Sequence, residues 1–227
     1  MCAIYGIIGK INQNLINDIS KKQLYRGPDK QNSYESIDKL AILGNNRLAV
    51  IDKENGHQPM TSEDGRYTIV FNGCIYNFLE IKNYLKNKNI IFKTNSDTEV
   101  LLNAYIFFGE IIFNYLDGMW SVAIYDSLKK KCVLSRDYVG QKPLYYSLQN
   151  EYLLFSSELT GLFQDKNIDK SICEVNLQKY FAYSFVPAPK TIFKNIFQLK
   201  PGELIEINAS TLRFKKKQYW DLADGPD

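Results

Sequence analysis

Short segments rich in β-branched and aromatic residues, each bounded by Gly, Asn, Asp or Pro, recur along most of the chain. They cover residues 3–9, 67–73, 118–126, 131–138, 143–149, 151–157 and 202–210. The segments on either side of DSLKKK (126–131) and of SLQNEY (147–152) are separated by only a few residues, which predicts two hairpins. A chain with this pattern is expected to form sheets of consecutive antiparallel strands.

Three helices are predicted between these strands, at residues 76–89, 97–109 and 175–184. In the first, Leu79, Ile81, Tyr84 and Leu85 mark one apolar face. The second is expected to start at a cap formed by Ser96 or Asp97 and to stop at Gly109. Because two helices follow each other directly instead of alternating singly with strands, the fold class expected is α+β with antiparallel sheets.

Composition excludes several classes of protein. The net charge of +3 on 227 residues is too weak for a nucleic-acid surface, and the one basic run, from Lys215, is expected to be a solvated strand edge. No apolar run approaches the roughly 18–20 residues of a membrane span, and no signal peptide is present. The four cysteines are far apart and there is one histidine, so a metal site is not expected. These features predict a cytoplasmic protein with no nucleic-acid or membrane partner.

The N-terminus places a cysteine directly behind the initiator methionine, in MCAIYGIIGK. Removal of Met1 would leave Cys2 with both a thiol and a free α-amine, whose reference pKa of about 7.7–8.0 lets part of it act as a base. One residue would then supply nucleophile and base. Two alternatives remain open: a Cys–His pair with His57, which lies in a polar turn-forming stretch, and a small core-facing cysteine without a reactive role.

A series of motifs favours the interpretation in which Cys2 supplies both the nucleophile and the base. In chain order they are MCAIYG (1–6), YRGPD (25–29), NNRLAVID (45–52), GHQPM (56–60), FNGCIYN (71–77), NSDTEVLL (95–102), LDGMWSVAIYD (116–126), RDYVGQKPLYY (136–146) and FSSEL (155–159). Together they resemble the glutaminase domain of class II glutamine amidotransferases, most closely that of the asparagine synthetase family. The resemblance covers residues 1–220 as one domain, and it implies that residues 221–227 begin a linker towards a synthetase domain.

The resemblance implies an N-terminal nucleophile hydrolase fold, a four-layer αββα sandwich of two antiparallel sheets with outer helices. It implies that Cys2 attacks the side-chain amide of glutamine through a thioester, with Asn72 and Gly73 as the oxyanion hole. Arg47 matches the residue that binds the α-carboxylate, and Asp97 matches the one that binds the α-ammonium group. The remaining expected site residues are Leu48, Ala49, Val50, Ile51 and Cys74, which line the substrate pocket, and Arg26, which supports the first strand.

This sequence departs from the family at two points. Cys74 stands where asparagine synthetases usually carry a glutamate that helps to hold the α-ammonium group, so weaker glutamine binding or altered selectivity is expected. No SGGxDS-type pyrophosphate loop occurs, so no cofactor is expected in this chain, and ATP and magnesium are expected only in an attached or partner synthetase. The end soon after YWDL favours a piece of a longer synthetase over a standalone glutaminase.

The resemblance leaves three matters open. The ammonia acceptor need not be aspartate, and a homodimer is compatible with the sequence. A catalytically silent domain that packs on a synthetase, and an N-terminal-cysteine amidase for another amide, remain rival interpretations.

Overall fold

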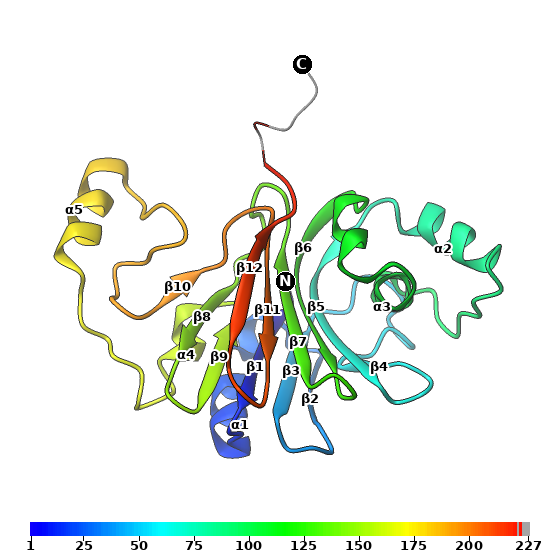
Figure 1. Cartoon of the computed structure of the whole chain (residues 1–227), viewed down its shortest axis with the longest axis horizontal. Helices are drawn as coiled ribbons and strands as arrows, with labels where there is room; N and C mark the ends of the chain where they lie inside the picture. The colour runs from blue at the N-terminus through cyan, green and yellow to red at the C-terminus, as the bar shows by residue number, and fades with distance from the viewer. Residues whose placement is uncertain (222, 224–227) are drawn as a thin grey trace.

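Two six-stranded antiparallel sheets face each other in the computed structural model, which describes residues 1–221 and 223 (Figure 1). The first sheet has the order β10-β8-β9-β1-β3-β2, and the second has the order β12-β11-β7-β6-β5-β4. The strands of the first sheet are β1 (Ala3–Gly9), β2 (Lys30–Glu35), β3 (Ala41–Arg47), β8 (Tyr145–Leu148), β9 (Tyr152–Ser156) and β10 (Phe197–Gln198). Those of the second are β4 (Met60–Thr61), β5 (Tyr67–Ile75), β6 (Gly118–Asp126), β7 (Lys131–Arg136), β11 (Glu203–Asn208) and β12 (Phe214–Gln218).

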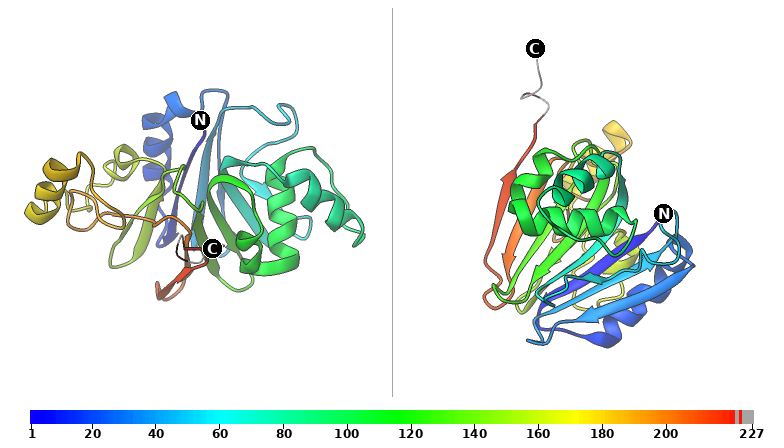
Figure 2. Two further views of the ribbon diagram at one scale, coloured as in Figure 1. Left: turned by 90° about the horizontal axis from the view of Figure 1, so that it is seen from above. Right: turned by 90° about the vertical axis from the view of Figure 1, so that its right-hand side faces the viewer.

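Helices cover the outer face of each sheet. The helices are α1 (Gln13–Lys22), α2 (Phe78–Lys86), α3 (Asp97–Phe108), α4 (Leu159–Leu162) and α5 (Glu174–Tyr183), with short 3₁₀ turns at Leu24–Arg26 and Gly109–Asn114. α1 lies on the outer side of the first sheet, while α2 and α3 cover the second (Figure 2). α5 lies apart from the sandwich, beyond β10 (Figure 1).

Alternation along the strands divides the apolar side chains into three buried clusters. Ile4 and Ile8 of β1 join residues of β6, β7 and β11 between the two sheets. Tyr5 and Ile7 of the same strand point the other way and pack against α1 and α4. On the second sheet, Trp120 packs beneath α3. Each sheet therefore has two buried faces, and the predicted four-layer αββα sandwich is confirmed.

The strand register brings the start of β1 and the polar end of β3 to one end of the first sheet. Because β1 and β3 run antiparallel with Ala3 opposite Asn46, the N-terminus of β1 lies beside the last residue of β3, Arg47. In the second sheet, Gly73 of β5 lies opposite Trp120 of β6. The chain start, the end of β3 and the last part of β5 supply the groups described below.

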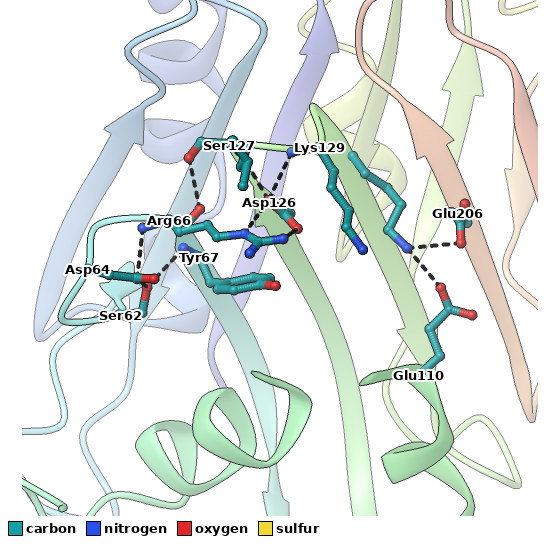
Figure 3. Close-up of polar contacts among 11 residues, drawn as sticks. Ser62, Asp64, Arg66, Tyr67, Glu110, Asp126, Ser127, Lys129 and Glu206 are labelled. Atoms are coloured by element: carbon teal, nitrogen blue, oxygen red, sulfur yellow. Dashed lines mark hydrogen bonds and ion pairs between the residues drawn. The ribbon is translucent and has the colours of Figure 1, made fainter. Parts of the chain in front are cut away.

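Ion pairs lie at the opposite end of the second sheet, where β5 begins and β6 ends (Figure 3). Arg66 donates two hydrogen bonds to Asp126, at 2.9 and 2.7 Å. Lys131 of β7 lies between Glu110 and Glu206, with N–O distances of 3.2 and 3.0 Å. Polar side chains at this end therefore pair with one another and form a structural edge.

Most of the predicted elements are present. The strands over both hairpins, the three predicted helices and the solvated edge strand at Lys215 are confirmed. Ser96 caps α3, its side chain accepting a hydrogen bond from the Thr98 N–H, and Gly109 follows the last residue with a positive φ of 67°. No helix in the described part of the chain is long and apolar enough to cross a membrane.

The predicted apolar face of α2 is partly wrong. Leu79 is 59% exposed and Tyr84 is 47% exposed, whereas Leu85 is fully buried. The buried stripe instead runs through Phe78, Ile81 and Leu85, at the i, i+3, i+7 spacing of a helix that packs on one side only. Of the predicted linker at residues 221–227, only residues 221 and 223 are described.

Candidate active site

A cavity of about 200 Å³ opens where the chain start, the end of β3 and the end of β5 converge. Its walls come from several segments that are far apart in the sequence. The lining residues are Met1, Cys2, Arg47, Leu48, Val50, Ile51, Gly56, Gln58, Phe71, Asn72, Gly73, Cys74, Ser96, Asp97, Thr98, Met119 and Lys142. A cysteine, a guanidinium group, a carboxylate and an ammonium group thus share one small chamber.

Cys2 lies at the mouth of this cavity, directly before β1. Its Sγ accepts a hydrogen bond from the Leu48 N–H at 3.4 Å and donates to the Leu48 carbonyl oxygen at 3.6 Å. The carbonyl oxygen of Cys2 accepts a hydrogen bond from Arg26 Nε at 3.1 Å. The thiol is therefore held on an ordered backbone, and Arg26 has the supporting position that the sequence predicted.

Arg26 is itself held in place by the segment that follows β9. Its Nη1 pairs with Glu158 at 2.7 Å, and the arginine side chain is 8% exposed. Ser157, the residue before Glu158, accepts a hydrogen bond from the Ile4 N–H at 2.9 Å through its hydroxyl. The start of β1 is thus attached to the segment that follows β9.

Asn72 carries a buried donor with no partner. Its side chain is 1% exposed, and its Nδ2 makes no hydrogen bond among the described residues. Burying an amide donor without an acceptor costs about 1–3 kcal/mol, so an arrangement of this kind points to an oxygen supplied from outside the protein. Asn72 is also one of the residues that line the cavity, which places this unpartnered donor in the cavity wall.

Gly73 is required by the neighbouring strand. A Cβ atom at this position would lie 2.1 Å from the carbonyl oxygen of Met119 and 2.8 Å from the Cα of Trp120. Both atoms belong to the backbone of β6 and cannot rotate away. The glycine therefore lets β5 approach β6 closely and leaves its own backbone bare at the cavity wall.

Arg47 organises the loop that follows β3. Its guanidinium group donates to the carbonyl oxygens of Lys53 at 2.9 Å, of Ile51 at 3.0 Å and of Asp52 at 2.7 Å. Gly56 leaves room for it, because a Cβ there would lie 2.7 Å from Nη2. Arg47 thus lines the cavity in a fixed orientation, with its guanidinium group hydrogen-bonded to three carbonyl oxygens of the loop.

Asp97 provides the carboxylate of the cavity. It is the first residue of α3 and is 4% exposed, and its Oδ2 accepts a hydrogen bond from the Ile75 N–H at 3.2 Å. Burial raises the pKa of Asp97 to about 6, although backbone hydrogen bonds and the charge of Arg47 act in the opposite direction. A cationic ligand group beside Asp97 would relieve this cost by stabilising the ionised form.

Cys74 is half-buried in the same wall. Burial raises the pKa of its thiol, the negative charge of Asp97 raises it further, and the positive charge of Lys142 lowers it. The side chain is consequently a neutral thiol near pH 7, and it offers no charge to a ligand.

The structure brings most of the predicted site residues together. Cys2, Arg47, Asn72, Gly73, Cys74 and Asp97 all line the cavity, as do Leu48, Val50 and Ile51. Ala49 is not among the lining residues; its N–H donates to Asp29 at 2.8 Å. His57 is exposed and is also not a lining residue, although both of its neighbours are.

Three polar lining residues, Gln58, Thr98 and Lys142, are not singled out by the sequence. Gln58 accepts a hydrogen bond from the Phe71 N–H at 2.6 Å and donates to Thr98 at 3.2 Å, so it joins β5 to the start of α3. The GHQPM motif was the available signal for it. Lys142 was read only as part of a strand start, and nothing in its neighbours indicates that its side chain is 8% exposed at the cavity.

Comparison with known proteins indicates one family for this chain. The family model for the glutamine amidotransferase domain matches residues 1–220. The chain belongs to that family. Its curated relatives include a putative glutamine-hydrolysing asparagine synthetase 2 of Methanocaldococcus jannaschii, 36% identical over 246 residues, which covers 99% of this chain and 47% of the relative. Asparagine synthetase 1 of Bacillus subtilis is 36% identical over 214 residues, covering 91% of this chain and 33% of the relative.

The chain thus spans about half or less of the length of these relatives. Among solved structures, glutamine phosphoribosylpyrophosphate amidotransferase from B. subtilis matches with a TM-score of 0.68 at 18% identity, covering 96% of this chain and 49% of that one. A structure described as the allosteric regulatory enzyme of purine biosynthesis matches with a TM-score of 0.66, also at 18% identity and with 96% and 49% coverage. These matches show the N-terminal nucleophile hydrolase fold of glutamine amidotransferases.

Proposed function

We propose that this glutamine amidotransferase domain hydrolyses L-glutamine to L-glutamate and ammonia, with Cys2 as the nucleophile. The observation that carries the proposal is the pairing of a thiol at the chain start with the buried, unpartnered donor of Asn72 in one cavity. Acyl transfer needs both: a sulfur that attacks a carbonyl carbon, and donors placed where the carbonyl oxygen becomes negative. Arg47 and Asp97 supply the two charges that an amino-acid head group would meet.

The chemistry begins when Met1 is removed, which frees the α-amine of Cys2. As Sγ forms a bond to the amide carbon, the amine takes the thiol proton and the carbonyl electron pair moves onto oxygen. Asn72 Nδ2 and the backbone of Gly73 stabilise that oxygen, and each donor contributes about 3 kcal/mol. The C–N bond then breaks, the amine returns its proton to the leaving nitrogen, and ammonia departs from a thioester. Water repeats the same steps and releases glutamate.

Recognition of glutamine follows from the charges of the cavity. The α-ammonium group binds the Asp97 carboxylate, whose burial otherwise penalises its ionised form. The α-carboxylate binds Arg47, taking part of the guanidinium group from the loop carbonyls that occupy it. Leu48, Val50 and Ile51 enclose the carbon chain between these ends.

The ammonia is passed to a synthetase, in the same polypeptide or in a partner subunit. The relatives are named as glutamine-hydrolysing asparagine synthetases and extend well beyond the matched region, which supports an ATP- and magnesium-dependent amidation carried out outside this chain. The names favour aspartate as the acceptor. The unpaired state of the four cysteines, all within the described residues, supports a cytoplasmic location.

Measurement of glutaminase activity in the Cys2→Ala variant tests the proposal. We expect no release of glutamate above background, with thermal unfolding unchanged within a few degrees. Cys173→Ala is the matched control, because this thiol is half-buried, lies outside the cavity and should be dispensable. Normal glutamine hydrolysis by Cys2→Ala would refute the mechanism.

A further inference from the structure

Lys142 is a buried cation that has no anionic partner among the residues that the structure describes. Its side chain is 8% exposed and lines the cavity that contains Cys2. Within the described residues, its ammonium group has one hydrogen-bond acceptor, the sulfur of Met1 at 3.5 Å, and it forms no salt bridge. A buried ammonium group that meets only a thioether is energetically unfavourable, so its retention calls for an electrostatic explanation.

The backbone of Lys142 is held firmly. Its N–H donates to Asp137 at 2.9 Å, and its carbonyl oxygen accepts a hydrogen bond from Arg136 at 2.7 Å. The side chain therefore extends into the cavity from a fixed base. There its charge lies close enough to Cys74 to lower the pKa of that thiol, against burial and the charge of Asp97.

The charged and titratable groups that line the cavity can be counted by sign. Arg47 and Lys142 are cationic, Asp97 is the one carboxylate, and Cys2 and Cys74 are thiols. Arg47 is already engaged by three carbonyl oxygens of its own loop. Lys142 is thus the cation of the cavity whose field is least compensated.

Removal of Met1 changes what Lys142 faces. The methionine sulfur disappears together with the residue, and the new chain end is the α-amine of Cys2, one residue further along. A protonated amine there would add a second positive charge beside the lysine ammonium group, and the two like charges would repel each other. A neutral amine would not, and its lone pair could accept a hydrogen bond from Nζ.

On this basis, and resting on the proposed glutaminase mechanism, we infer that Lys142 is a positioning residue that keeps the α-amine of Cys2 unprotonated near neutral pH. Lys142 acts through Cys2 and need not touch glutamine.

The test compares the pH dependence of kcat/KM for the wild type, Lys142→Met and Lys142→Arg. Methionine keeps most of the side-chain volume and removes the buried charge, whereas arginine keeps the charge. We expect the acid limb of Lys142→Met to move to higher pH by about one unit, so that activity at pH 6.5 falls roughly tenfold while activity at pH 9 changes little. Lys142→Arg should follow the wild-type profile.

Lys82→Met is the control for loss of a buried lysine. Lys82 is 7% exposed, its ammonium group donates to the Thr94 carbonyl oxygen at 2.8 Å, and it does not line the cavity. Its loss should lower stability and leave the acid limb in place. If Lys142→Met loses activity equally at every pH, its role is structural and the inference is overturned.

A second readout does not depend on glutamine. The rate of Cys2 alkylation by iodoacetamide, resolved by site through mass spectrometry, should fall at pH 7 in Lys142→Met and recover in Lys142→Arg. Wild-type protein that alkylates normally but releases no glutamate would refute the proposed function alone. Alkylation and kcat/KM profiles that are both unaltered in Lys142→Met would refute this inference alone.

Discussion

Arg26 links the backbone of Cys2 to Glu158. Its Nε donates to the carbonyl oxygen of Cys2 at 3.1 Å, and its Nη1 pairs with Glu158 at 2.7 Å. The proposed nucleophile is the second residue of the chain, where backbone order is usually poor. In this protein a largely buried ion pair supplies that order. We therefore expect the reactivity of Cys2 to depend on Arg26, a side chain that need not contact substrate.

Replacement of Arg26 by methionine should weaken both the fold and the site. Loss of one partner leaves Glu158 without its cation and the Cys2 carbonyl without its donor, so we expect unfolding free energy to fall by about 2–3 kcal/mol. Glutaminase activity at saturating glutamine should fall more than tenfold, because a thiol displaced by an ångström attacks poorly. Urea denaturation and a glutamate-release assay measure the two effects.

Lys10→Met is the matched control. It breaks the Lys10–Glu151 pair, in which both side chains are more than 60% exposed, and should change stability by less than about 0.5 kcal/mol. An Arg26→Met variant with wild-type stability and activity would show that the first strand positions Cys2 without this arginine.

Asp97→Asn should separate stability from function. Burial raises the pKa of Asp97 to about 6, above the unfolded value of 3.8, so the native state binds more protons between these two pH values. Stability without ligand therefore decreases as pH rises through this window, and the cost of about 3 kcal/mol is fully present above pH 6. Because asparagine is neutral, the Asp97→Asn variant does not carry the cost of burying an ionised carboxylate.

We accordingly expect Asp97→Asn to be more stable than the wild type by up to about 3 kcal/mol at pH 7.5, narrowing to about 1 kcal/mol at pH 4.5. Its KM for glutamine should rise at least tenfold, since the α-ammonium group loses its carboxylate. Urea denaturation at both pH values measures the difference in unfolding free energy between the variant and the wild type. Asp18→Asn, on the exposed side of α1, is the control. A variant that is less stable at pH 7.5 would contradict the electrostatic reading of this site.

Cys74→Glu should tighten glutamine binding. The present thiol offers no charge, and a carboxylate beside Asp97 would add one charge-assisted bond to the α-ammonium group. We expect KM for glutamine to fall about tenfold, the equivalent of roughly 1.5 kcal/mol. Cys74→Ser, which adds no charge, should keep KM within about threefold. An unchanged KM in Cys74→Glu would mean that this position does not face the ammonium group.

The strands of the two hairpins were predictable because their apolar periodicity and turn residues are local features. Segments 118–126 and 131–136 alternate clearly and pack as expected, with Trp120, Val122 and Ile124 on one buried face. β3 was not predicted as a strand, because its second half, Gly44 to Arg47, is glycine followed by polar residues. Those residues are buried for reasons that only the fold supplies: Asn46 accepts a hydrogen bond from Tyr5, and Asn45 donates to the carbonyl oxygen of Ala3.

The site residues also divide into those that a sequence motif indicates and those that only the fold brings into place. The family motifs identified Cys2, Arg47, Asn72 and Asp97, and the structure gathers them around one cavity. Lys142 carries no such signal, because lysine in a loop before a strand is ordinarily solvated. Its burial depends on hydrogen bonds to Arg136 and Asp137, which pair with its backbone across a turn that sequence patterns do not specify.

The central claim is that Cys2, as the processed chain end, is the group that reacts with the side-chain carbonyl of glutamine. Intact-mass measurement after incubation with a glutamine-analogue electrophile tests it most directly, followed by peptide mapping of the adduct. We expect a protein that lacks Met1 and carries a single adduct, located on Cys2 and prevented by excess glutamine. Retention of Met1 with an adduct on Cys2, or an adduct on Cys74 in place of Cys2, would contradict it.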